Sequence, residues 1–293
     1  MSLVSFVRAN DSSIDALKKA IKRSLNLIRF SFARSINKIV IKPNMCYYYP
    51  PSTGEVTSPQ FVSAVIDIFR ENLSINPDFF IVESDASAMK CKYVFKMLGY
   101  HRIAKEKNVK LINLSEEKNK IVDIKVNGWY LRFYIPEIFH ESDFLINVPK
   151  IKYMADVKIT CALKNMYGCN AYPRKSIYHV ALNEAIVGIN KIIKPDLVIV
   201  DGLIVYGKNT RRLNLVMASK DPVALDAAAS NVMGIDPTSV HQLVLASKEN
   251  IGNLEFIPVG EAFSYVKQSF PAKSVKDKIR ETLASTYLRI FHE

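Results

Sequence analysis

The sequence has few glycines and no long apolar run, and both absences limit what the protein can be. Glycine accounts for 10 of the 293 residues and no stretch is of low complexity, so disorder is not expected beyond the two ends of the chain. The absence of any apolar run of about 18 residues predicts that no segment spans a membrane. Residues 1–11 have no apolar core of the signal-peptide kind, so no secretion signal is expected.

Cysteine is also scarce. Cys46, Cys91, Cys161 and Cys169 form no CxxC pair, a pattern that is typical of free thiols in a reducing compartment and predicts a cytoplasmic protein. Cys161 and Cys169 flank Lys164, and thiols near lysines and helix starts ionise more easily. One hypothesis is therefore that Cys46, Cys161 and Cys169 meet and hold a soft metal or an iron–sulfur cluster. The simpler interpretation is that they are buried structural thiols.

Sequence motifs for the common cofactors and catalytic devices are missing. The chain contains no GxGxxG and no GxxxxGK[ST], so neither nucleotide-binding fingerprint is present. It also contains no GxSxG and no HExxH, which are the marks of two large hydrolase classes. The substrate and the reaction therefore cannot be taken from a short motif.

Charge of one sign is in excess. The formal net charge is +12, and a basic excess attracts polyanions or acidic small molecules. The lysines are scattered along the chain, which is typical of solvated helix faces. A nucleic-acid-binding alternative would use Tyr47, Tyr48 and Tyr49 as stacking platforms beside Lys42, and the opposing interpretation is a loop of partly buried tyrosines.

Predicted strands and helices alternate along most of the chain. This alternation predicts an α/β fold with a mainly parallel sheet and helices on both faces. Asn127-Gly128 between two alternating segments predicts a β-hairpin insertion near residues 120–135. We expect one compact unit, or two lobes covering 1–118 and 119–293, with a further helix over 273–292. The sequence does not indicate an oligomeric state.

Polar residues are concentrated where the predicted buried strands end. Ligands of open α/β sheets bind beyond the carboxyl ends of the strands, so these groups predict a polar crevice. Each group by itself is also compatible with ordinary turn and cap chemistry. The groups are Lys42-Pro43-Asn44, Glu83-Ser84-Asp85, Asn147-Val148-Pro149-Lys150, Asp201-Gly202 and Lys220-Asp221.

The segment 160–169 has the most unusual composition. Thr160 is placed to cap a short helix whose free N–H groups favour anions, and Lys164 adds a positive charge one turn later. Arg174 and His179 follow closely. We therefore predict a site for a small carboxylate or phosphate. The opposing interpretation is a helix with a surface lysine and a core histidine.

The leading hypothesis is an enzyme or binding protein for a small anion in this crevice. Lys164 and His179 are the catalytic candidates, His179 because its ordinary pKa lies near neutrality, with Asp85, Asp201 or Asp226 to orient it or a metal. The candidate ligand-binding residues are Lys42, Asn44, Thr57, Asp85, Lys150, Lys152, Thr160, Asn165, Arg174, Asp201 and Asp221. A metal or iron–sulfur protein, a nucleic-acid-binding protein and a non-catalytic interaction module are the alternatives.

The same segments, taken in order, resemble the domain of unknown function (DUF) 362 family. The resemblance spans about residues 35–260, and each piece alone is short. The pieces are IKPN at 41–44, EVTSP at 55–59, FLINVPKIK at 144–152, ITCALKNMYGC at 159–169, His179, PDLVIVDG at 195–202 and ASKDPVALDAAASNVMG at 218–234. Many members carry a CxxCxxCxxxCP module, which is absent here, so the electron-transfer role of that module is not implied.

A more distant resemblance is to the nickel-pincer lactate racemase family. The matching order is Tyr153, then Lys164 in a helix-opening turn, then His179. In that family a lysine and histidines hold a pyridinium-derived nickel cofactor, so the resemblance implies a nickel-type cofactor at these positions. This chain has Tyr153 in place of a histidine and lacks the glycine-rich turn before Lys164.

Overall fold

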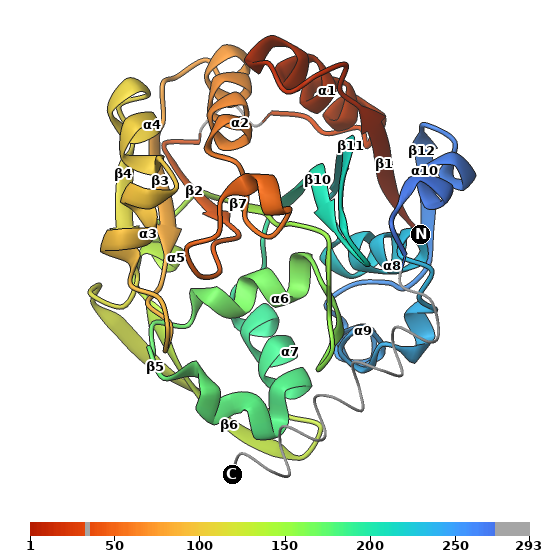
Figure 1. The fold of residues 1–293 in the computed structure, drawn as a ribbon. Helices are drawn as coiled ribbons and strands as arrows, with labels where there is room; N and C mark the ends of the chain where they lie inside the picture. Colours follow the sequence, from red (N-terminus) through yellow and green to blue (C-terminus); the bar gives the residue numbers. More distant parts are fainter. Residues whose placement is uncertain (33–35, 273–293) are drawn as a thin grey trace.

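The structure is a computed structural model that describes residues 1–32 and 36–272. Its centre is a 10-stranded sheet whose main path runs β12-β1-β11-β10-β7-β2-β3-β4, with β8 and β9 joined beside β10 (Figure 1). The strands are β1 (Ser2–Arg8), β2 (Lys38–Pro43), β3 (Asp78–Glu83), β4 (Lys110–Asn113), β7 (Phe144–Val148), β8 (Lys152–Met154), β9 (Lys158–Thr160), β10 (Leu197–Tyr206), β11 (Thr210–Ser219) and β12 (Phe256–Gly260).

The direction of the strands decides which residues share an edge of the sheet. Strands β10, β7, β2, β3 and β4 pair in parallel, and β11 runs antiparallel to both of its neighbours, β1 and β10. Strands β1, β10, β7, β2 and β3 therefore all end at one edge, where β11 begins. We call this the carboxyl edge.

Helices cover both faces of the sheet (Figure 1). Alternate strand residues face opposite layers, so Ile39 and Ile41 lie in one hydrophobic core and Val40 in the other. One face carries α1 (Ile14–Leu27), α2 (Pro59–Asn72), α3 (Cys91–Met97) and α4 (Tyr100–Glu106), and the other carries α6 (Ala162–Met166), α7 (Leu182–Ile192), α8 (Pro222–Val232) and α9 (His241–Lys248). The predicted α/β fold with a mainly parallel sheet is confirmed.

Short elements connect these layers. They are α5 (Ile138–Glu141), α10 (Phe263–Ser269) and the 3₁₀ helices η1 (Pro51–Thr53), η2 (Tyr167–Cys169), η3 (Lys175–Ala181) and η4 (Pro237–Ser239). The main sheet takes strands from both of the proposed lobes, 1–118 and 119–293. The division into one unit or two lobes stays a prediction.

The predicted hairpin is present as β5 (Asn119–Val126) and β6 (Trp129–Pro136). Asn127 and Gly128 both have positive φ, 45° and 87°, as a two-residue type I′ turn requires. The Phe133 ring of β6 packs against Gly188 of α7. A Cβ at position 188 would lie 2.9 Å from a ring carbon of Phe133. The hairpin therefore forms a layer outside α7.

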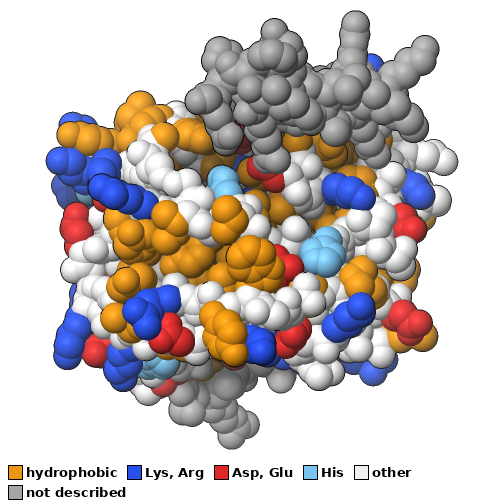
Figure 2. Space-filling view, turned by 90° about the horizontal axis from the view of Figure 1, so that it is seen from below, with side chains coloured by type: hydrophobic (Ala, Val, Ile, Leu, Met, Phe, Trp, Pro, Cys, Tyr) orange, Lys and Arg blue, Asp and Glu red, His pale blue; other side chains and the backbone are white. Residues whose placement is uncertain are grey.

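The outer surface beside this layer includes exposed apolar side chains. Trp129 and Tyr130 of β6 and Ile177 and Val180 of η3 are all exposed. Figure 2 shows the molecule from this side, with hydrophobic side chains gathered across the left and middle of the face and lysines and arginines scattered around them.

Four local expectations from the sequence need correction or fall outside the described part: a helix cap at Asp11 or Ser12, a helix over about 178–193, a helix over about 89–98 closed by Gly99, and the helix over 273–292. The residue that caps α1 is Ser13, and not Asp11 or Ser12, because the Ser13 hydroxyl accepts a hydrogen bond from the backbone N–H of Ala16. The helix predicted over 178–193 begins as 3₁₀ helix η3, and α7 starts only at Leu182. Gly99, with φ 82°, ends α3 as predicted but is followed at once by the unpredicted α4. The expected helix at 273–292 lies outside the described residues.

Candidate functional site

Five lysines converge from four places in the chain on the carboxyl edge. Lys42 ends β2, Lys150 and Lys152 follow β7, Lys164 lies in α6, and Lys175 opens η3. Lys42 and Lys150 are each 1% exposed, and Lys152 and Lys175 are each 8% exposed, so four of the five are buried. Lys164 is partly buried. Such burial is rare for lysine, because the charged form loses its hydration.

Two of these lysines have buried acidic partners. The Nζ of Lys42 lies 2.7 Å from Oε2 of Glu83, and the Nζ of Lys150 lies 3.0 Å from Oδ1 of Asp201. Burial lowers the pKa of Lys150, and the charge of Asp201 opposes that effect. Asp201 also accepts from the backbone N–H of Ser58 at 2.8 Å, next to the first residue of α2. The first ion pair joins the neighbouring strands β2 and β3, and the second joins the segment after β7 to the middle of β10. Both ammonium groups therefore have a carboxylate partner.

The other three lysines have no carboxylate within ion-pair distance among residues 1–32 and 36–272. Lys152 donates to Sγ of Cys46 at 2.7 Å and to a backbone carbonyl at 3.0 Å. Lys175 donates to Oγ of Ser84 at 2.7 Å and to the carbonyl of Asp85 at 2.6 Å. Burial lowers the pKa of Lys175 to about 8.

Lys164 has the least-satisfied amine of the set. Its Nζ lies 5.3 Å from the centre of the Tyr167 ring, and no described residue forms a hydrogen bond with it. Burial, and then the like charge of Lys152, lower the pKa of Lys164 to about 8. Cys46 and the exposed Asp156 act in the opposite direction on the pKa of Lys164.

A buried amide network lies directly behind the lysines. Asn165 of α6 accepts from Nδ2 of Asn44 at 3.0 Å and donates to Asn147 at 2.7 Å and to the carbonyl of Lys42 at 3.1 Å. Thr57 accepts from the N–H of Asn44 and donates to the carbonyl of Val148. The structure thus brings the predicted residues Lys42, Asn44, Thr57 and Asn165 together. The Oδ1 of Asn44 is buried without a hydrogen-bond partner among the described residues.

The start of α6 is not the open anion site that the sequence suggested. The carboxylate of Asp226, which is fully buried in α8, accepts from the N–H groups of Ala162 and Leu163 at 2.6 and 3.0 Å. Thr160 does not cap α6, because the cap position is Cys161 and the Thr160 hydroxyl instead contacts Sδ of Met154 at 3.7 Å. The protein therefore supplies its own carboxylate to these N–H groups.

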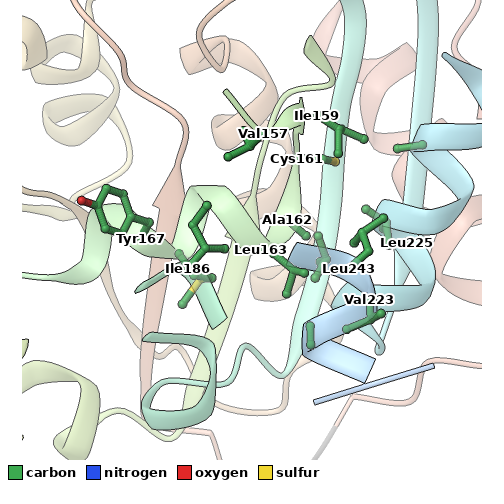
Figure 3. Close-up of a cluster of buried hydrophobic side chains, with 14 of the residues drawn as sticks. Val157, Ile159, Cys161, Ala162, Leu163, Tyr167, Ile186, Val223, Leu225 and Leu243 are labelled. Atoms are coloured by element: carbon green, nitrogen blue, oxygen red, sulfur yellow. The ribbon is translucent and has the colours of Figure 1, made fainter. Parts of the chain in front are cut away.

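Apolar packing keeps α6 in this place. Figure 3 shows Ala162 and Leu163 between Ile186 of α7 and Leu225 and Leu243 of the neighbouring helices. All five side chains are buried. Because its apolar side faces inward, the helix presents Lys164 and Asn165 toward the carboxyl edge and the amide network.

Two predicted aspartates accept hydrogen bonds from backbone N–H groups at helix starts, Asp85 at α3 and Asp221 at α8. Burial raises the pKa of Asp85, but hydrogen bonds from Lys90 and the Cys91 backbone outweigh that effect and the pKa is lowered. Asp221 accepts from Val223 and Ala224 and caps α8. It lies at the opposite edge of the sheet, because β11 is antiparallel and ends there. The placement of Asp221 in the crevice was therefore wrong.

Arg174 and His179 are both exposed in or beside η3, and no hydrogen bond joins either of them to Lys164 among the described residues. Lys175, between them, is the buried residue of this segment, and sequence reasoning missed its importance. The structure thus provides no contact that supports Arg174 as an anion ligand or His179 as a proton-transfer group. The tyrosines Tyr47 and Tyr49 are exposed, but Lys42 is buried and so cannot serve a nucleic-acid backbone beside them.

The cysteines do not share one site. Cys46 contacts Lys152, Cys161 neighbours Asp226, and Cys169 lies near Lys42 and Glu83. Burial raises the pKa of Cys169 to about 12 and that of Cys161 well above its ordinary value, which opposes the thiolate that metal binding needs. In the described part of the chain, no group of three or more His, Cys, Asp or Glu side chains is arranged to hold a metal ion.

These positions do not fit either of the cofactors suggested by the sequence. An iron–sulfur cluster needs several converging thiolates, and the described cysteines are apart. For a nickel-pincer arrangement the corresponding donors would be Tyr153, Lys164 and His179, of which His179 is exposed and Tyr153 is not a histidine.

The family described as "Domain of unknown function (DUF362)" matches residues 39–231, about two thirds of the chain. The chain belongs to this family. It is 25% identical over 235 residues to the thylakoid-associated protein sll1697 of Synechocystis sp., an alignment that covers 76% of this chain and 70% of that protein. No helix in the described ranges is long and apolar enough to cross a membrane.

A solved structure to which the chain is similar is the lactate racemase apoprotein of Thermoanaerobacterium thermosaccharolyticum. The sequence identity is 11% and the TM-score is 0.46, with 80% of this chain and 58% of the other covered. This chain therefore spans less than two thirds of that protein.

Proposed function

We propose that this DUF362 protein binds a small anionic ligand at the carboxyl edge of its sheet, with Lys152 and Lys164 as the direct cationic contacts. Lys42, Lys150 and the amide network around Asn165 form the rigid base of the site. A reducing, cytoplasmic setting is part of the proposal, since the four cysteines are free.

The observation that carries the proposal is the charge balance of this edge. Five lysines lie along this edge, with Lys42 near Lys175 and with Lys152 near both Lys150 and Lys164. Among the described residues only Glu83 and Asp201 form an ion pair with any of them. Lys152, Lys164 and Lys175 thus remain without a carboxylate partner in that part of the chain, although two of them are buried and the third is partly buried. Unpaired buried charge destabilises a fold. A bound carboxylate or phosphate would offset this cost.

Lys164 also has the chemistry for proton transfer. Because its pKa is lowered to about 8, the ammonium and the free amine are both populated near neutral pH. We therefore assign Lys164, rather than the exposed His179, as the residue that would exchange a proton with a bound ligand. This assignment would make the protein an enzyme if the ligand has an acidic or basic centre within reach of Nζ.

Substitution of Lys164 tests the proposal. We expect Lys164→Ala to weaken binding of malonate, measured by isothermal titration calorimetry, by about tenfold or more, because a charge-assisted hydrogen bond contributes roughly 1.5–3 kcal/mol. Lys105→Ala, which removes an exposed charge from α4, is the matched control and should bind as the unmodified protein does. Equal malonate affinity in the Lys164 variant and the control would sink the assignment.

The pH dependence gives a second readout of the same site. An anion is held by the protonated amine, so malonate affinity should fall as the pH rises through about 8 and Lys164 loses its proton. The affinity of Lys164→Ala should change much less over the same range. A parallel fall in both proteins would show that another group controls binding.

A further inference from the structure

A basic cavity lies at the carboxyl edge, beside β1 and β11. It has a volume of about 120 Å³ and is lined by Arg8 at the end of β1, Arg211 and Arg212 near the start of β11, and Tyr265 and Ser269 of α10, among others. This volume is several times the roughly 10–15 Å³ that one water molecule requires. The cavity is thus large enough for a polyatomic ion.

Arg211 and Arg212 both contribute to the lining of this cavity, although consecutive residues of a strand point to opposite faces. They pair in regular register with Val205 and Ile204 of β10, and the register shift between β10 and β11 begins only beyond Arg212, between the pairs Ile204–Arg212 and Gly202–Leu215.

The three guanidinium groups have no acidic partner in the part of the chain that the structure describes. None of Arg8, Arg211 and Arg212 lies within 4.0 Å of a carboxylate oxygen of those residues. Arg8 donates to the hydroxyl oxygen of Tyr265 and lies 5.3 Å from the centre of that ring. The Tyr265 hydroxyl proton is therefore free to point to a ligand. Three uncompensated positive charges around one small cavity favour an anion there.

We propose that Arg8, Arg211 and Arg212 form a phosphate-binding site for a phosphorylated small molecule. A carboxylate has one charge and two oxygens, which a single bidentate arginine satisfies. A phosphate ester has about two negative charges and three strong acceptor oxygens, so it can engage three forked guanidinium groups at once. The number and type of side chains thus match phosphate better than carboxylate.

This site is separate from the lysine site, although both lie at the carboxyl edge. Tyr206, the last residue of β10, pairs with Lys152 of β8 on one side and with Thr210 of β11 on the other. Strand β10 thus lies between Lys152 of β8 and the arginines of β11. Neighbouring strands of a sheet are about 4.8 Å apart. The proposal does not depend on ligand binding at Lys164, and each site can be removed without the other.

The test is titration of the full-length protein with inorganic phosphate by calorimetry. In a Lys164→Ala background, which removes the other anion site proposed above, we expect the added double substitution Arg211→Gln/Arg212→Gln to lower phosphate affinity at least tenfold. A double variant of exposed α4 residues, Arg102→Gln/Lys105→Gln, removes the same charge from a distant surface and should bind phosphate as the unmodified protein does. Arg211→Lys/Arg212→Lys keeps the charge without the fork and should bind with intermediate affinity.

Three outcomes would overturn the proposal. They are no phosphate binding by the unmodified protein at millimolar concentration, equal binding by the Arg211→Gln/Arg212→Gln variant, and an equal loss in the α4 control, which would indicate only general charge attraction. Because the arginines are exposed, the variants should melt within a few degrees of the unmodified protein, so weak binding cannot be blamed on unfolding.

Discussion

Replacement of Asp226 by asparagine tests whether the carboxyl group at the start of α6 titrates near neutral pH. Burial raises the pKa of Asp226 to about 7 from an ordinary value of 3.8, against the hydrogen bonds from Leu163 and Ala162. Below the lower value both the folded and the unfolded chain hold the proton. Between the two values only the folded chain holds it, so stability is lost as the pH rises.

The size of this loss of stability follows from the difference between the folded and unfolded pKa values of Asp226. One pKa step is worth 1.36 kcal/mol, so the free energy of unfolding of the unmodified protein should fall by about 3 kcal/mol from this group between about pH 5 and pH 8. The amide of the Asp226→Asn variant has no such titrating proton. The asparagine side chain has one acceptor oxygen for the two buried N–H groups of Ala162 and Leu163. The N–H group left without an acceptor should lower the free energy of unfolding of the variant by about 1–3 kcal/mol at low pH.

The assay is urea unfolding of both proteins across this pH range. We expect Asp226→Asn to be the less stable protein at about pH 5 and the stability difference to vanish or reverse by about pH 8. Other titrating groups cancel in the difference between the two proteins. A difference that stays constant with pH would refute the reasoning, since it would mean that Asp226 keeps one protonation state throughout.

Two further substitutions test the supports of the site. Glu83→Gln leaves the ammonium of Lys42, 1% exposed, without its carboxylate and should cost about 3–5 kcal/mol in urea unfolding. Glu71→Gln in the exposed pair with Lys18 should cost less than about 1 kcal/mol, and similar losses in the two variants would contradict the buried-charge argument. Gly202→Ala places a Cβ 2.7 Å from the carbonyl oxygen of Leu215, so it should lower stability by about 1–3 kcal/mol; an unchanged melting temperature would show that the strands can separate there.

The layer arrangement and the base of the site could be predicted from the sequence because both depend on local patterns. Buried strands such as 38–41 and 79–82 are short apolar runs that end in polar residues, and parallel strands bring those ends to one edge. That rule correctly gathered Lys42, Asn44 and Lys150. It failed for Asp221, because the sequence does not state that β11 runs antiparallel.

Other parts of the site depend on contacts between distant segments. Asp226 lies 63 and 64 residues from the N–H groups that it accepts, and no spacing rule links them. A usable signal was present, since Asp226 is the only charged residue in the apolar helix Pro222–Val232 and a lone buried carboxylate needs donors. Lys175 had no such signal, because it adjoins Arg174 in a segment without helical or strand periodicity.

The occupation of the α6 start by Asp226 changes how an anion would be recognised. An open helix start would attract any anion through backbone N–H groups, but here those donors are already used. An anion would then be recognised by side chains of two kinds. Lys164, with a pKa of about 8, changes its charge near neutral pH, whereas the arginines near β11 stay charged at every physiological pH. Binding at the lysine site should therefore respond to pH near neutrality, whereas binding at the arginine site should respond only through the ionisation of the phosphate itself.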